Sequence, residues 1–231
     1  MGAMVLACGR AERVALSPTL ANRSDVTFEH VPERPGKADV DDLLAGVGPD
    51  TDHDRVVVVG DDADLAAVVL RLLRTDRLVD VPVGFAPLSP ASDVVATWDL
   101  PAHGEEALAL ALDGEPRRVP LIRDDNGGVL VGLGRIGPLR GVAYCDDTMV
   151  LRGPARAIVV RPHAMGVEVG VHYLGRLWRR SGTIRGRAFE LGCLPATVTR
   201  DGVPHERQVK RWHWYRHTQD LRLIKGRTGN A

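Results

Sequence analysis

A run of four consecutive valines, Val56–Val59, limits the fold of this chain more than any other feature. A β-branched run without polar interruption predicts a strand that is buried on both faces, as in a parallel sheet. Gly60 ends the run, and a helical pattern follows as far as about Arg74. Its apolar residues recur at helical spacing: Leu65, Val68, Val69 and Leu72. We therefore expect a strand, a tight turn and a helix in this order.

A second unit of the same kind follows about twenty residues later. Val81–Ala86 reads as another buried strand, and the Ser89–Ala91 turn leads into a helix that starts near Ser92. Two strand–helix units in succession predict an α/β domain with a parallel sheet.

The other elements expected in this domain are shorter. Glu12–Ser17 is the candidate first strand, and Met1–Cys8 reads as a disordered start or an edge segment. Val26–Val31 is a second strand. A helix over Asp39–Gly46, with Asp39 as its N-cap, and a closing helix over Glu105–Leu112 complete the prediction.

The pattern changes after about residue 116, where short β-rich runs alternate with turn signals such as Asn126-Gly127-Gly128 and Asp201-Gly202. Such a pattern predicts an antiparallel sandwich or meander. We therefore divide the chain into an α/β domain, residues 1–115, and a β-sandwich-like domain, residues 116–231. The expected runs are Val119–Arg123, Val129–Leu133, Val142–Cys145, Met149–Leu151, Ala157–Val160, Val167–Tyr173, Ala188–Leu191, Ala196–Thr199 and Leu221–Ile224.

Composition narrows the class of protein. The three cysteines, Cys8, Cys145 and Cys193, lack metal-site spacing and indicate reduced thiols in a cytoplasmic protein. No apolar run reaches the ~20 residues that a membrane-spanning helix needs. Attachment to the membrane periphery stays open. The high usage of Ala, Val, Arg and Asp is typical of a GC-rich bacterial source.

The net charge is zero, but the charges are unevenly distributed. Residues 151–231 hold 16 Lys or Arg and five Asp or Glu, a net charge of +11, which leaves −11 for residues 1–150. This asymmetry indicates an anionic partner for the C-terminal half, such as a lipid headgroup, a nucleic acid or an acidic protein. An attraction between the two halves explains it equally well, and homodimer formation is a further interpretation.

Two short motifs have weak functional meaning here. Gly132–Gly137 matches GxGxxG, but Pro138 and a β-rich run follow where a dinucleotide site needs a helix, so we expect a glycine-rich hairpin edge. His213 and His217 are four residues apart without the Glu of HExxH, which makes a zinc site improbable.

The segment Lys210–His217 interleaves cations with aromatic residues, a pattern that suits phosphate and base contacts or a membrane interface. In a strand, however, Trp212 and Trp214 would share one face. We therefore favour core packing for both tryptophans.

The two strand–helix segments resemble the nucleotide loops of the diacylglycerol kinase catalytic family, which shares its fold with NAD kinases. Gly60 and Asp62 match the first glycine and the aspartate of the family's GGDGT loop. Ser17-Pro18 stands where the family has Asn-Pro. Five residues match the P-x-GTGND segment and its surroundings in register: Gly84, Pro87, Asp93, Leu100 and Pro101.

The resemblance implies functional positions. Asp201 lies in a turn similar to the family's DGE, whose first acidic residue is held to be the general base. By the same resemblance Asp62 would hold Mg²⁺. ATP would lie against the residues of both loops, which are Gly60, Asp61, Asp62, Ala63, Asp64, Ser89, Ser92 and Asp93.

The loops nevertheless depart from the family's pattern in one direction. Asp61, Ala63 and Asp64 replace two glycines and a threonine, and the other loop reads Ser89–Ser92 in place of GTGN. Glycines let backbone amides approach phosphates closely, and Pro90 removes an amide altogether. Three carboxylates would also repel a triphosphate. Two interpretations follow: a lipid kinase that uses ATP and Mg²⁺, or a degenerate, non-catalytic binding module with a basic C-terminal half.

Overall fold

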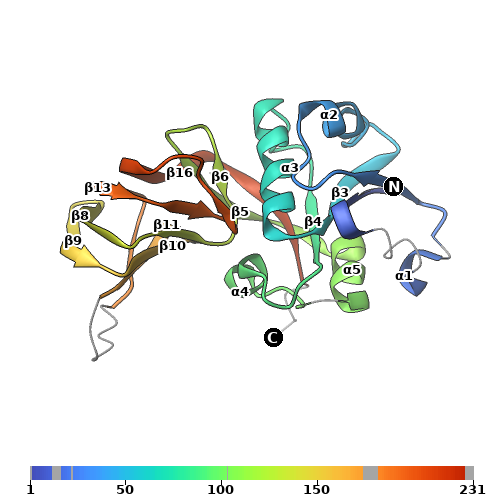
Figure 1. The fold of residues 1–231 in the computed structure, drawn as a ribbon. Helices are drawn as coiled ribbons and strands as arrows, with labels where there is room; N and C mark the ends of the chain where they lie inside the picture. The colour runs from blue at the N-terminus through green and yellow to red at the C-terminus, as the bar shows by residue number, and fades with distance from the viewer. Residues whose placement is uncertain (1, 12–16, 22, 103, 174–181, 227–231) are drawn as a thin grey trace. The chain divides into compact units, whose positions relative to one another are not determined.

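The computed structural model describes residues 2–11, 17–21, 23–102, 104–173 and 182–226. The chain forms two compact units, the first made of residues 1–119 and 219–231, the second of residues 120–218 (Figure 1). The sequence analysis divided the chain once, near residue 115. The structure instead returns the last segment to the first unit, because the end of a long strand pairs there.

The first unit contains a parallel sheet in the order β2-β1-β3-β4. The end of β16 joins it, with Leu223 paired to Val83 in parallel. All four valines of the run are buried, as the sequence predicts for a strand inside a parallel sheet. The strands are β1 (Gly2–Cys8), β2 (Val26–Val31), β3 (His53–Gly60), β4 (Val83–Pro87) and β16 (Val209–Lys225).

Helices cover both faces of this sheet, with α2 and α3 on one side and α5 on the other (Figure 1). The side chains of Val57 and Val59 pack with Leu108 and Leu112 of α5, while α3 buries the apolar stripe that begins at Leu65. The helix predicted over Asp39–Gly46 begins earlier and has Gly36, not Asp39, as its N-cap. The helices are α1 (Pro18–Ala21), α2 (Lys37–Ala45), α3 (Asp62–Arg74), α4 (Asp93–Trp98) and α5 (Gly104–Asp113).

The prediction for the start of the chain is wrong. Gly2–Cys8 is a fully buried strand that pairs with β2 on one side and β3 on the other, not a disordered or edge segment. The candidate strand Glu12–Ser17 lies, apart from Ser17, outside the described residues. Cys8 is 1% exposed within β1, and burial together with the nearby charge of Asp64 raises the pKa of its thiol to about 12.

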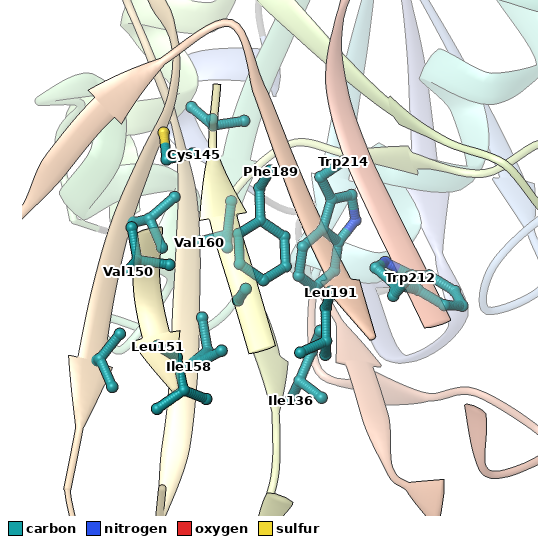
Figure 2. Close-up of a cluster of buried hydrophobic side chains, with 14 of the residues drawn as sticks. Ile136, Cys145, Val150, Leu151, Ile158, Val160, Phe189, Leu191, Trp212 and Trp214 are labelled. Atoms are coloured by element: carbon teal, nitrogen blue, oxygen red, sulfur yellow. The ribbon is translucent and has the colours of Figure 1, made fainter. Parts of the chain in front are cut away.

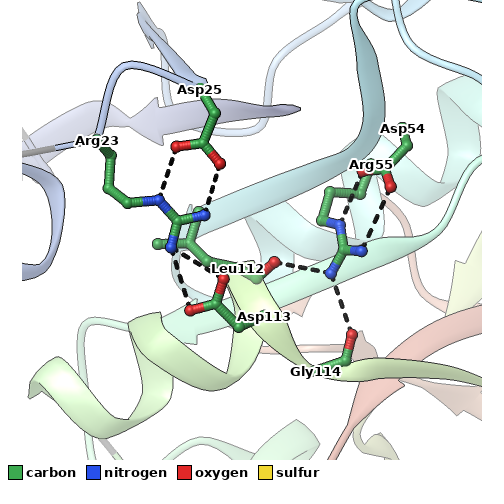
Figure 3. Close-up of polar contacts among 7 residues, drawn as sticks. All are labelled: Arg23, Asp25, Asp54, Arg55, Leu112, Asp113 and Gly114. Carbon is green, nitrogen blue, oxygen red and sulfur yellow. Dashed lines mark hydrogen bonds and ion pairs between the residues drawn. The ribbon is translucent and has the colours of Figure 1, made fainter. Parts of the chain in front are cut away.

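Arginine side chains bind the C-terminal end of α5 (Figure 3). Arg55 donates from one nitrogen to the carbonyl oxygens of Leu112 and Gly114, at 2.7 and 3.0 Å. Arg23 bridges Asp25 and Asp113 with N–O distances of 2.8 and 2.9 Å. Carbonyls at a helix C-terminus lack intrahelical partners, so these guanidinium groups fix the position of α5 under the sheet.

The second unit is built from antiparallel strands in two layers. One layer runs β16-β13-β8-β9 and the other runs β12-β11-β10-β7-β14-β15. Short turns connect most of the strands, as predicted. The strands are β5 (Glu115–Asp124), β6 (Val129–Leu130), β7 (Gly134–Ile136), β8 (Leu139–Cys145), β9 (Thr148–Ala155), β10 (Ala157–His163), β11 (Gly166–His172), β12 (Ile184–Gly186), β13 (Ala188–Ala196), β14 (Val198–Arg200) and β15 (Val203–Pro204).

One apolar core lies between these two layers (Figure 2). Trp212 and Trp214 are 2% and 0% exposed and pack edge to face, with ring centroids 5.7 Å apart. Phe189 lies beside Trp214 at 6.0 Å. The core interpretation of the two tryptophans is confirmed. Among the described residues, no helix has the length and apolar character needed to cross a bilayer.

Candidate nucleotide-loop site

The backbone of the loop after β3 is hydrogen-bonded by a side chain from α3, the helix that follows it. Asp64 is only 4% exposed, and its carboxylate accepts hydrogen bonds from the backbone N–H groups of Asp61 and Arg34, at 2.8 and 2.7 Å. A Cβ at Gly60 would meet one carboxylate oxygen of Asp64 at 2.4 Å. Gly60 is therefore required by the close approach of Asp64.

The loop after β4 is also hydrogen-bonded by a side chain from α3. The carboxylate of Asp62 accepts from the hydroxyl of Ser92 through Oδ1. Its Oδ2 accepts from the backbone N–H groups of Asp93 at 2.8 Å and Val94 at 3.3 Å. Ser92 is the N-cap of α4 and also accepts from the N–H of Val95 at 3.1 Å. The first turn of α3 thus supplies the negative charge that the start of α4 favours.

A third carboxylate, which the sequence analysis missed, acts in the same way. Glu105 in the first turn of α5 accepts from the hydroxyl of Ser17 at 2.7 Å and from the backbone N–H of Thr19 at 3.1 Å. Hydrogen bonds from the side chains of Thr19 and Ser17 lower the pKa of Glu105. Ser17, which by resemblance stands at the family's Asn-Pro position, therefore binds a carboxylate of the chain itself, that of Glu105.

Not every predicted loop residue takes part. Asp61 is exposed at the N-cap of α3, and Ala63 lies half-buried in the first turn. Ser89 accepts from the N–H of Ala91 at 3.2 Å within its own turn. The structure thus brings together Asp62, Ser92 and Asp93 on one side, and Gly60, Asp61 and Asp64 on the other.

These contacts occupy the groups that Mg-ATP would use. Phosphates bind at helix N-termini through free N–H groups, but here carboxylates accept from them. The carboxylate of Asp62 already accepts three hydrogen bonds from the loop after β4, so a Mg²⁺ ion bound there would compete with these donors. Within the described residues, no group of three or more His, Cys, Asp or Glu side chains could hold a metal ion. The loops as they stand do not fit Mg²⁺ or a triphosphate.

The burial of Asp62 is expected to make the free energy of unfolding depend on pH. Burial raises the pKa of this carboxyl, and the hydrogen bond from Ser92 offsets part of the rise. The folded state therefore binds more protons than the unfolded state above pH ~4 and loses stability as the pH rises through the folded pKa. We expect the stability difference between Asp62→Asn and the wild type to shift in favour of the variant as the pH rises through the folded pKa of Asp62.

Asp41 provides the control with the opposite sign. A hydrogen bond from Arg71 lowers the pKa of its carboxyl. The stability that Asp41 contributes is therefore present above its unfolded pKa and lost as the pH falls through the folded pKa. Urea unfolding of Asp62→Asn and Asp41→Asn across the pH range should give slopes of opposite sign relative to the wild type. If the difference in free energy of unfolding between Asp62→Asn and the wild type did not change with pH, burial would not raise the pKa of Asp62 as we infer.

Asp201, the predicted general base, belongs to the second unit and is 4% exposed. Its carboxylate accepts from the backbone N–H groups of Val131, Gly132 and Leu133, at 3.1, 2.8 and 3.0 Å. The backbone of Asp201 is left-handed, with φ of 45°, in the turn between β14 and β15. This carboxylate holds the segment before β7 in place.

The same contacts explain the GxGxxG match. Gly134–Ile136 is strand β7, which pairs with β10 on one side and β14 on the other, so the predicted hairpin edge is wrong. Strand β8, not a helix, follows the glycines, as expected. A Cβ at Gly134 would meet the indole ring of Trp214 at 2.5 Å. The glycines therefore serve packing and the amide contacts to Asp201.

The sequence predicts that a basic C-terminal face includes Arg179, Arg180, Arg185, Arg187, Lys210 and Arg211, and the structure describes this set only in part. Arg179 and Arg180 lie outside the described residues, whereas Arg185, Arg187, Lys210 and Arg211 are exposed. Arg185 pairs with Glu168 at 2.7 Å. His213 lies 2.7 Å from Asp125, at the start of the β5–β6 turn.

Comparisons with known proteins support the fold. Neither the family models nor the curated proteins contain a match to this sequence. Among solved structures, the chain is similar to a diacylglycerol kinase from Bacillus anthracis str. Sterne, with a TM-score of 0.70, 12% identity and 97% of each chain covered. It is also similar to an NAD kinase from Archaeoglobus fulgidus in complex with ATP, with a TM-score of 0.59, 14% identity, and 98% of this chain and 94% of that chain covered. The chain therefore has the diacylglycerol kinase and NAD kinase-like fold.

Proposed function

We propose that this chain is a non-catalytic protein with a lipid-kinase-like fold, in which ATP-dependent phosphotransfer is weak or absent. The observation that carries the proposal is the engagement of Asp62 and Asp64 with the amides and the hydroxyl of their own loops. A carboxylate held within the chain competes with any incoming phosphate and incurs no loss of translational entropy on binding. Nucleotide would have to displace these contacts.

We further propose that the protein acts by binding an anionic partner through its second unit. Residues 120–218 hold 16 Lys or Arg and eight Asp or Glu, a net charge of +8. A net charge of this size raises the affinity and association rate for anionic surfaces. The competing enzymatic interpretation has ATP and Mg²⁺ at the nucleotide loops and Asp201 as the base, and the next experiment decides between them.

Isothermal titration with Mg-ATP tests the absence of nucleotide binding. We expect no saturable heat up to about millimolar Mg-ATP, because carboxylates of the chain already accept from the loop N–H groups of Asp61, Asp93 and Val94. An ATP-binding kinase of the same fold, titrated in the same buffer, serves as the positive control. A dissociation constant in the micromolar range would overturn the proposal and make a phosphotransfer assay with a lipid acceptor the next step.

A further inference from the structure

One face of the second unit carries an unusual set of side chains. It is the side of the β16-β13-β8-β9 layer that points away from the core, here called the outer sheet face. The strand register places its outward residues in three cross-strand rows. These rows are His213–Glu190–Tyr144–Met149, Arg211–Gly192–Val142–Arg152, and Arg140–Pro154. Leu194, in the adjoining bulge of β13, lines the same groove as Arg140.

The outer sheet face gathers exposed apolar side chains. Leu194 is 64% exposed, the highest value among the large apolar side chains described as exposed. It lies in the bulge where residues 193–195 of β13 face only Lys210 of β16, so the strand turns it outward. Met149, Tyr144 and Val142 are 44%, 38% and 36% exposed on the same face. A contiguous apolar patch of this kind marks an interaction surface.

Arginines frame the apolar patch. Arg140, Arg152 and Arg211 are exposed on this face, where Glu190 is the outward carboxylate of the rows. Within the described part of the chain, none of the three guanidinium groups forms an ion pair or a hydrogen bond. The face therefore has a net positive charge with its cations available to a partner.

A shallow groove of about 460 Å³ lies within this face. Arg140, Val142 and Leu194 line it together with Gly141, Gly153 and Gly192. Cys193 also lines the groove. A Cβ at Gly153 or Gly192 would meet nothing within 4 Å, so these two glycines leave space for a small anionic group beside a guanidinium and an aliphatic side chain.

We propose that the outer sheet face docks on an anionic lipid bilayer. This inference deepens the proposed anionic-partner role and rests on it for the charge of the partner. The apolar side chains would enter the acyl boundary while the arginines bind lipid phosphates, a combination that characterises interfacial membrane attachment. The lipid is favoured over a nucleic acid because the most exposed groups, Leu194 and Met149, are aliphatic and cannot stack on bases. It is favoured over a second copy of the chain because the arginines would then face each other.

Vesicle flotation with the full chain tests the inference. We expect binding to vesicles of phosphatidylcholine and phosphatidylglycerol, little binding to phosphatidylcholine alone, and weakening of the binding by salt. Leu194→Ser should weaken the binding about tenfold through lost apolar burial. Arg140→Gln and Arg152→Gln should each weaken it about fivefold through lost phosphate contacts.

Matched control variants come from the other layer of the sandwich. Met165 is 55% exposed in the turn between β10 and β11, and Arg135 is exposed on β7. Met165→Ser and Arg135→Gln likewise replace an exposed apolar side chain and an exposed arginine. Both should leave vesicle binding unchanged, and a loss equal to that of Leu194→Ser and Arg140→Gln would overturn the placement of the surface.

The outcomes separate this inference from the proposed function. Absence of binding to phosphatidylglycerol vesicles at low salt overturns membrane docking. If the same variants instead weaken binding to a single-stranded oligonucleotide, the anionic-partner role stands and the lipid is wrong. If vesicles bind and Mg-ATP also binds, the docking surface stands while the non-catalytic proposal fails.

Discussion

Replacing Asp201 by alanine is expected to lower the free energy of unfolding of the second unit by roughly 3–5 kcal/mol. The substitution removes the acceptor of the backbone N–H groups of Val131, Gly132 and Leu133, and the first two of these contacts are buried. A buried donor that is left without a partner loses its full hydration, which is more costly than the bond itself contributes. Urea unfolding followed by tryptophan fluorescence measures the change, because Trp212 and Trp214 lie in the core of this unit.

The variants Asp201→Asn and Asp147→Ala sharpen this test. Asparagine keeps one carbonyl oxygen but places an NH₂ group among backbone donors, so we expect about half of the alanine effect. Asp147 is exposed in the β8–β9 turn of the same unit, and its replacement should change stability by less than about 0.5 kcal/mol. An Asp201→Ala protein as stable as the wild type would show that the carboxylate is free for another role, including that of a base.

The second large effect is expected at Gly60. Gly60→Ala should destabilise the first unit by roughly 2–4 kcal/mol, because the new Cβ would meet the Asp64 carboxylate at 2.4 Å. The carboxylate would have to leave the N–H groups of Arg34 and Asp61. Far-UV circular dichroism follows this unit, since the described helices all belong to it.

A double-mutant cycle with Asp64→Gly isolates the cause. The second substitution removes both the carboxylate and the Cβ that crowd position 60. In that background we expect Gly60→Ala to cost less than about 1 kcal/mol, which gives a coupling energy near 2 kcal/mol. If Gly60→Ala costs the same in both backgrounds, then Gly60 is required for a reason other than the approach of Asp64.

The sequence predicts the repeated strand–helix units of this fold well. The valine run of β3 is continuous and β-branched, the stripe that begins at Leu65 has the helical period, and Ser92 is an effective N-cap signal. Strand β1 escapes prediction because Gly2–Cys8 shows no alternation and, unlike the valine run, holds a single β-branched residue. A short apolar stretch at the start of a chain has the same pattern whether it is a strand or not.

The contacts of the candidate site could not be predicted from the sequence. Motif spacing identifies Asp62, Ser92 and Asp93 as loop residues. It does not reveal that the carboxylate of Asp62 accepts a hydrogen bond from the N–H of Asp93, 31 positions away. The contact of Asp201 with Val131 spans 70 positions. Pairings over such distances depend on the tertiary fold, whereas a motif records only neighbours along the chain.

The path of β16 affects how the protein is made. This 17-residue strand begins in the second unit and ends in the first, where Leu223 pairs with Val83. During synthesis, the first unit therefore cannot complete its sheet until the end of β16 leaves the ribosome, which happens only after residues 120–218 have been translated. A stop or frameshift anywhere in the second unit would leave the β4 edge of the parallel sheet unpaired and open to association with other chains.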